Sequence, residues 1–257
     1  MKNKLLILIL SLLFLLINSS YSEELNFESS QIEILEKGNL IKAEGGVKIF
    51  SSNDIEIEGN ESLYNKEKLL LKASGEVIVN DKQNNIKITT DEIIYNKQKE
   101  IISALKKTNQ VIVNDKKNDV IINSDEIIYN KQKEIISAFK KTNQVIVNDK
   151  KNELIIDSDQ IVYDSKKLTF NATGEVIVND KKNELLIDSD EIIYNKQKEI
   201  ISAFKKTNQV IVNDKKNELV IDSDEIIYNK KKKIISFTGN TFAKIKNKYQ
   251  IKSTEII

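Results

Sequence analysis

Three acidic corners recur in the second half of the chain, and these are the residues best suited to metal chemistry. Each reads Asp-Ser-Asp, and they lie at 157–159, 188–190 and 222–224. Carboxylates on adjacent strands offer the hard oxygen ligands that calcium prefers. Calcium-binding β-rolls are rich in glycine, however, and this chain has only 7 glycines. We therefore expect no metal at these corners and interpret the aspartates as residues that shape a turn.

Paired lysines are the second candidate for chemistry, as ligands for phosphate groups. They stand at 106–107, 140–141 and 205–206. The competing interpretation, which we favour, is that they are solvated lysines that keep sheet edges from aggregating. All basic residues are lysines, so the bidentate arginine fork for phosphate is missing. The net charge is +1 with alternating signs along the sequence, which predicts no basic stripe and no nucleic-acid partner.

The sequence lacks the residue types that most often act in catalysis. The chain has no histidine and no cysteine. This excludes thiolate zinc sites, histidine general bases and the usual nucleophile–histidine pairs. We predict that the protein is not an enzyme and that it needs no cofactor.

A tyrosine-headed unit repeats along most of the chain and determines how any site would be positioned. Tyrosines at 64, 95, 129, 163, 194 and 228 are separated by steps of 31 or 34 residues. Five of the six lie in a frame like Asp-Glu-Ile-Ile-Tyr-Asn. Such a period predicts a stacked repeat architecture. We divide the chain into residues 1–22, a capping repeat at 23–63 and tandem repeats at 64–257, the last of them incomplete.

Each unit has the pattern of short β-strands, with apolar residues at alternate positions. The alternation slips by one residue at a fixed place, as at Thr90–Glu92, which predicts a bulge or corner. Two turn types explain the two step lengths: the shorter units turn with glycine, as at Gly75, whereas the longer ones use Lys-Lys-Thr-Asn. The prediction is an all-β chain. We expect the tyrosines to form a structural ladder of half-buried rings.

The N-terminus has the pattern of a secretory signal peptide. Lys2 and Lys4 precede an apolar run from Leu5 to Ile17, and serines occupy positions 20 and 22. The run is shorter than the roughly 20 residues needed to span a bilayer. We predict cleavage after residue 22 and export. The competing interpretation is an uncleaved membrane anchor.

Two segments carry a resemblance to a known family. Ile156–Asp164 followed by Phe170–Val178 fits the frame I-x-A-D-x-I-x-Y-D and I-x-A-x-G-x-V-x-I, and Leu71–Val79 fits its second half. The chain thus resembles the OstA-like domains of the lipopolysaccharide-transport family, found in LptA and in the N-terminal arm of LptD. The opening at Ile32–Asn39 is more similar to an LptD arm. The longer units depart from the family because they lack its glycine.

The resemblance implies a twisted, open β-jelly-roll of antiparallel strands whose V-shaped groove holds the acyl chains of lipopolysaccharide in the periplasm, near the outer membrane. It also implies end-to-end pairing with other Lpt modules. An outer-membrane barrel would belong to a missing C-terminal part, since the sequence stops in the middle of a repeat. The residues expected to line the groove are Leu71, Ala73, Val77, Val79, Ile93, Ile102, Ala104, Val111 and Val113.

A different class of function remains open at this stage. A secreted β-solenoid with a structural or adhesive role would have the same repeats and the same leader. Its interior would be tightly filled, whereas a lipid carrier would have an apolar groove.

Overall fold

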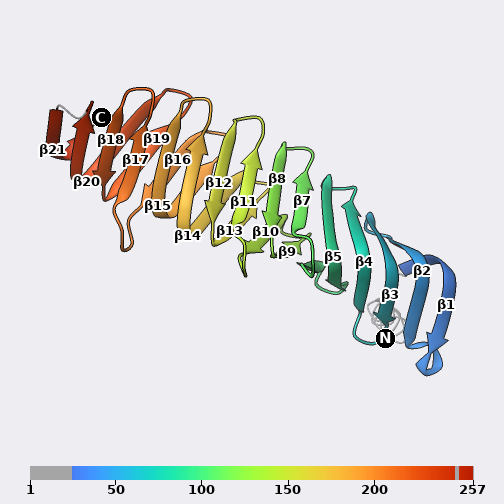
Figure 1. Cartoon of the computed structure of the whole chain (residues 1–257). Coiled ribbons are helices and arrows are strands. Elements are labelled where there is room, and N and C mark those ends of the chain that lie inside the picture. Colours follow the sequence, from blue (N-terminus) through green and yellow to red (C-terminus); the bar gives the residue numbers. More distant parts are fainter. Residues whose placement is uncertain (1–24, 247–248, 257) are drawn as a thin grey trace, which may run out of the picture.

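The computed structural model describes residues 25–246 and 249–256, which form strands joined by turns and one 3-10 helix. The strands follow one another along a single long axis in sequence order (Figure 1). Their bounds are β1 Leu25–Leu35, β2 Leu40–Ser51, β3 Ile55–Asn65, β4 Leu70–Asp81, β5 Ile86–Asn96, β6 Ile101–Leu105, β7 Val111–Asp115, β8 Val120–Ser124, β9 Glu126–Asn130, β10 Ile135–Phe139, β11 Val145–Asp149, β12 Leu154–Ser158, β13 Gln160–Asp164, β14 Thr169–Asp180, β15 Leu185–Asn195, β16 Ile200–Phe204, β17 Val210–Asp214, β18 Leu219–Ser223, β19 Glu225–Asn229, β20 Ile234–Ile245 and β21 Tyr249–Ile256; the helix η1 is Glu36–Gly38.

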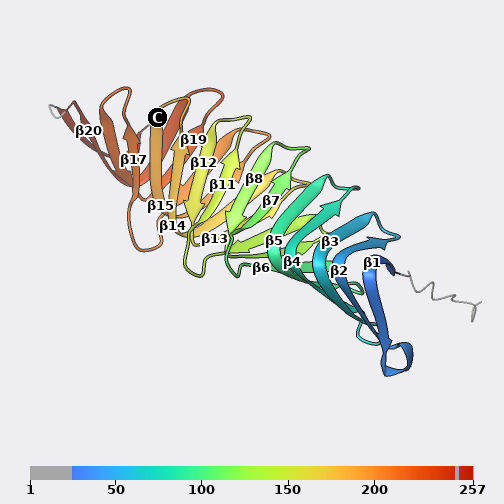
Figure 2. The ribbon, with the colours of Figure 1, turned by 45° about the vertical axis from the view of Figure 1, so that its right-hand side comes forward.

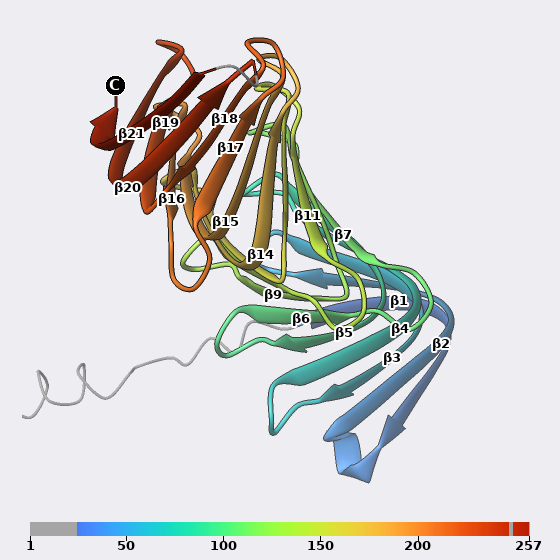
Figure 3. The same cartoon turned by 60° about the vertical axis from the view of Figure 1, so that its left-hand side comes forward.

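The long strands bend in the middle, so that each belongs to two layers (Figures 2 and 3). β4 pairs with β5 in two blocks, and the register shifts between Ser74 and Val77. In the longer units the bend becomes a break: β6 and β7 are separate strands, yet both pair with β5. The corner predicted from the slipped alternation is therefore present, and all pairings among the described strands are antiparallel.

We call the two halves the tyrosine layer and the aspartate layer. The tyrosine layer contains β6, β9, β10, β13, β16 and β19 together with the tyrosine-bearing halves of the long strands. The aspartate layer contains β7, β8, β11, β12, β17 and β18 together with the other halves. The layers meet at the bends, which we call the apex. Their opposite margins, which we call the lips, are formed by the turns that follow the tyrosines and the aspartates.

Side chains from both layers fill one continuous apolar interior. Along the tyrosine layer, small and large residues alternate in register, as in the row Ala73, Ile93, Ala104, Ile127 and Ala138. This alternation lets neighbouring strands interdigitate with the layer opposite. The interior is uncovered at the N-terminal end, where Ile32 and Ile34 of β1 are 44% and 68% exposed.

The expectation of an all-β chain of antiparallel strands is confirmed. The predicted signal peptide at 1–22 lies outside the described residues, and the proposed repeat boundaries at 23–63 and 64–257 stay predictions. Among the residues that the structure describes, there is no helix of the length and apolarity that a membrane span requires.

Candidate functional site

A row of polar contacts joins the two lips, and we call this row the seam. Four tyrosine hydroxyls cross the interior to aspartates of the opposite layer, at 2.6–2.8 Å. The pairs are Tyr129–Asp81, Tyr163–Asp115, Tyr194–Asp149 and Tyr228–Asp180. A tyrosine and an aspartate together span the distance between packed sheets, whose backbones lie about 10 Å apart. The partners are 45 or 48 residues apart, so each contact ties one repeat to an earlier one.

We call each tyrosine–aspartate pair, with the side chains bonded to it, a latch. The latch at Asp149 shows how the bonds are arranged. Tyr194 donates its hydroxyl proton to Oδ2 of Asp149 at 2.8 Å, and the side-chain amide of Asn152 donates to the same oxygen at 2.8 Å. The ammonium of Lys196 donates to Oδ1 of Asp149. Asp149 is completely buried and Lys196 is 7% exposed. A buried ion pair of this kind is tolerated because every charged atom has a partner.

The latches differ in whether a lysine contacts the aspartate. Lys230 contacts Asp180 at 2.5 Å, as Lys196 contacts Asp149. Lys131 lies 3.9 Å from Asp81 and donates instead to Gln83 on the opposite lip at 2.6 Å. In the unit headed by Tyr163 the lysine is replaced by Ser165. The seam is therefore a series of related clusters of unequal strength.

Burial and hydrogen bonding change the acidity of these groups. Burial, with the neighbouring carboxylate, holds the pKa of Tyr129, Tyr163, Tyr194 and Tyr228 well above the usual value of 10. At Asp180 burial alone would raise the pKa, but hydrogen bonds from Lys230, Asn183 and Tyr228 outweigh it and lower the pKa. The tyrosines are neutral donors and Asp180 is an anionic acceptor at neutral pH.

Sequence reasoning missed the aspartates of the seam, although a signal was present. In Val-Ile-Val-Asn-Asp, alternate residues point to one face, so an aspartate follows two inward valines onto the apolar side. A charged residue at an inward position requires a partner, and the tyrosine of a later unit provides it. The rings we expected to be half-buried are enclosed: Tyr95, Tyr129, Tyr163 and Tyr194 are at most 1% exposed.

The residues predicted to line a groove all point into the interior. None of the nine is more than 2% exposed: Leu71, Ala73, Val77, Val79, Ile93, Ile102, Ala104, Val111 and Val113. The V-shaped groove that the resemblance implies is thus closed along the lips by the seam. Whether these residues contact lipid stays a prediction, but their common face is the inner one.

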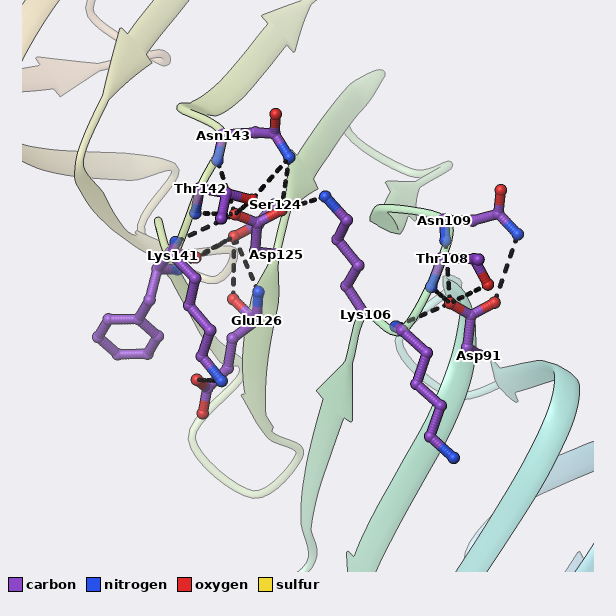
Figure 4. A network of polar contacts seen from close by, with 12 residues as sticks. Asp91, Lys106, Thr108, Asn109, Ser124, Asp125, Glu126, Lys141, Thr142 and Asn143 are labelled. Carbon is purple, nitrogen blue, oxygen red and sulfur yellow. Dashed lines mark hydrogen bonds and ion pairs between the residues drawn. The ribbon is translucent and has the colours of Figure 1, made fainter.

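The aspartate that closes the corner of each unit, equivalent to the second aspartate of Asp-Ser-Asp, organises the apex. Oδ2 of Asp91 accepts the backbone N–H groups of Lys107, Thr108 and Asn109 at 2.6–2.9 Å, and Asp125 holds the next loop in the same way (Figure 4). In the shorter units this place faces glycine: a Cβ added at Gly174, whose φ is +100°, would lie 2.5 Å from Asp159. One aspartate position therefore serves both turn types.

The paired lysines of these loops face carboxylates at the apex. Lys106, Lys140 and Lys205 contact aspartates of the following unit at 2.7–3.0 Å. Their neighbours Lys107, Lys141 and Lys206 contact glutamates at 2.6–2.9 Å. The four pairs in which neither partner is buried contribute about 0–1 kcal/mol each, whereas Asp125 and Glu92 are buried carboxylates. These pairs form a ladder along the apex, with their charge already balanced.

The apex aspartates predict a pH effect on stability. Backbone hydrogen bonds from Thr108 and Asn109 hold the pKa of Asp91 far below its usual value of 3.8, and those from Thr207 and Asn208 do the same for Asp190. A lowered folded pKa stabilises the protein above the unfolded pKa, and this stabilisation is lost as the pH falls through the folded pKa. We expect the urea concentration at the midpoint of unfolding to decrease once the pH is lowered below about 4.

The variant Asp91→Asn/Asp190→Asn should flatten that fall in a series of urea melts. Asp188→Asn is the matched control, because Asp188 is exposed on the outer face of the same corner. An equally steep decline in the double variant would contradict this account of the apex.

Comparison with known proteins finds similarity among solved structures. No family model and no curated protein matches the sequence. The chain is similar to LptH. That crystal structure is described as the LptA homologous periplasmic component of the lipopolysaccharide transport device of Pseudomonas aeruginosa. The TM-score is 0.41 at 16% identity, and the match covers 48% of this chain and 87% of LptH.

Proposed function

We propose that the chain is a lipopolysaccharide-binding module of the Lpt type, which carries lipid toward the outer membrane. The acyl chains would occupy the interior between the two layers, and the sugars and phosphates would stay outside at the lips. No covalent bond is made or broken, so the module needs no catalytic residue and no cofactor.

The continuous apolar interior is the observation that carries the proposal. It runs from Ala43 to Ala243, and the buried charged residues beside it lie at its margins, at the lips and, for Glu92 and Asp125, at the apex. Such an interior is a suitable solvent for acyl chains, at about 0.8 kcal/mol per buried methylene. A lipid that enters would replace contacts between the layers with contacts of its own.

The chemical nature of the seam supports the proposal for a second reason. The apex is a backbone connection, whereas the seam consists only of side-chain contacts. Parting the lips therefore breaks hydrogen bonds and ion pairs such as Tyr194–Asp149 and Lys196–Asp149 but no strand pairing. A head group at the margin requires the lips to be parted where it lies.

The N-terminal end suggests the kind of partner. β1 pairs with β2 on one side, and Ile32 and Ile34 point into the uncovered end of the interior. Another Lpt-type β-jelly-roll could add its edge strand there and extend the apolar interior. With the predicted signal peptide, the module would act in the periplasm at the outer membrane, and a barrel could belong to a longer protein of the LptD type.

A filled β-solenoid with a structural or adhesive role is the second candidate. It is favoured by the tight burial of the nine predicted lining residues and by the closed seam. The two functions differ in one respect: only a carrier exchanges interior contacts for lipid.

Photo-crosslinking at two neighbouring positions tests the proposal. Ile102 is fully buried and points inward, whereas Ile101 lies on the outer face of the same strand. A photoreactive amino acid at Ile102 should capture lipopolysaccharide in cells that make it, and the same group at Ile101 is the matched control. Capture at neither position by folded, exported protein would favour the filled solenoid.

A further inference from the structure

The chain is nearly neutral, but the fold gathers its lysine-rich turns at the lips, which are therefore basic. Eleven turns form the lips between β3 and β20, and they contain 23 lysines against 8 acidic residues. The net charge of these turns is +15 in a chain of net charge +1, and the six aspartates that end the strands beside them, at 81, 115, 149, 164, 180 and 214, lower the net charge of this margin to +9. The sequence led us to expect no basic stripe, because along the chain the signs alternate. Folding brings the lysine-rich turns to one margin.

These turns form two parallel rows, which we call the lysine rails. The rail of the aspartate layer includes the exposed pairs at 116–117, 150–151, 181–182 and 215–216. The rail of the tyrosine layer includes exposed lysines at 99, 133, 166–167, 198 and 231–233. Successive turns on one lip are two strands apart, about 10 Å. This is close to the screening length of about 8 Å at physiological salt, so each rail presents a nearly continuous field.

The rails come together at the seam, where small cavities lie between them. One cavity of about 240 Å³ is lined by Lys117 and Lys151 from one lip and by Lys196 from the other, together with the acidic residues Asp119 and Glu199. Another, of about 220 Å³, combines Lys216, Lys233 and Asp214 with Tyr228 and Ile235 of the interior. Cationic and apolar groups thus meet at one place, as recognition of an anionic amphiphile requires.

We propose that the lysine rails bind the phosphate groups of the lipid whose acyl chains occupy the interior. This inference rests on the proposed function and adds the part of the ligand that stays outside. Lysine is a compact cation that binds phosphate as a point charge, which suits a head group that moves from turn to turn along the margin.

Binding of lipopolysaccharide to the purified full-length protein tests the rails. The rail variant carries glutamine at Lys116, Lys117, Lys150, Lys151, Lys181 and Lys182, all exposed. The matched control carries glutamine at six exposed lysines away from the lips: Lys48, Lys107, Lys141, Lys205, Lys206 and Lys252. The second probe is the same lipopolysaccharide after enzymatic removal of its phosphates.

We expect the rail variant to bind lipopolysaccharide at least about tenfold more weakly and the control variant to bind almost as wild type does. Wild-type affinity should fall as salt increases, and it should fall when the phosphates are removed. Equal losses in the two variants, or equal affinity for both probes, would overturn the proposal.

Two further results separate this proposal from the others. Capture of the phosphate-free probe at Ile102 would preserve the proposed function even if the rails failed, whereas no capture of either probe would remove both. Double-stranded DNA that binds wild type more tightly than lipopolysaccharide, and loses affinity only in the rail variant, would overturn the lipid assignment in favour of a nucleic-acid surface.

Discussion

Asp149→Ala is expected to destabilise the protein by about 3–5 kcal/mol, because it leaves the buried ammonium of Lys196 without its counter-ion. The hydroxyl of Tyr194 and the side-chain amide of Asn152 lose the same acceptor. Repeat proteins unfold locally, so urea melts followed by circular dichroism should be combined with hydrogen exchange of the amides in β11, β12 and β15.

The companion variants show whether the buried charge causes the effect. Asp149→Ala/Lys196→Met removes both charges and should recover more than half of the lost stability, since an apolar pair can replace a buried ion pair. Asp188→Ala, at an exposed aspartate of the outer face, should change stability by about 0.5 kcal/mol or less. A double variant no more stable than the single one would contradict this explanation of the seam.

Phe170→Ala is expected to cost about 3–5 kcal/mol, the usual cost of a large cavity in a core. Phe170 is fully buried and stacks between two rings of the tyrosine row, at centroid distances of 4.3 Å to Tyr163 and 5.6 Å to Tyr194. Offset aromatic contacts add to the loss of buried area. Urea unfolding of the purified chain measures the change.

Phe170→Ile is the matched control, because isoleucine already occupies the equivalent place at Ile102, Ile136 and Ile201. It should lose less than half of the stability that Phe170→Ala loses. Equal losses for the two variants would mean that the interior of this unit depends on the aromatic stack itself and not on the filled volume.

The sequence was sufficient to predict the architecture because local signals repeat. The tyrosine period indicated stacked units, and alternating β-branched residues indicated strands. The slip at Thr90–Glu92 predicted the corner that Asp91 now organises. The exchange of glycine for Lys-Lys-Thr-Asn predicted two turn types, and the structure has both, with φ of +100° at Gly174.

The seam and the lysine rails could not be predicted from the sequence, and the reason is physical. Tyr194 bonds to an aspartate 45 residues earlier and Tyr163 to one 48 residues earlier, and no local pattern sets these separations. They follow from how the two layers are offset when they pack. The basic margin depends equally on the fold, because lysine-rich turns alternate in sequence with acidic strand ends and meet only when successive strands stack.

The most direct test of the account is to lock the lips and measure lipid capture. The chain has no cysteine, so Gln83→Cys/Lys131→Cys can be joined across the seam by a short bis-maleimide; these two side chains bond at 2.6 Å in the native protein. A photoreactive group at Ile102, which pairs with Tyr129 beside this lock, reports lipid in the interior. We predict that the unlinked variant captures lipopolysaccharide and the linked one does not. Equal capture by linked and unlinked protein would contradict loading through parted lips.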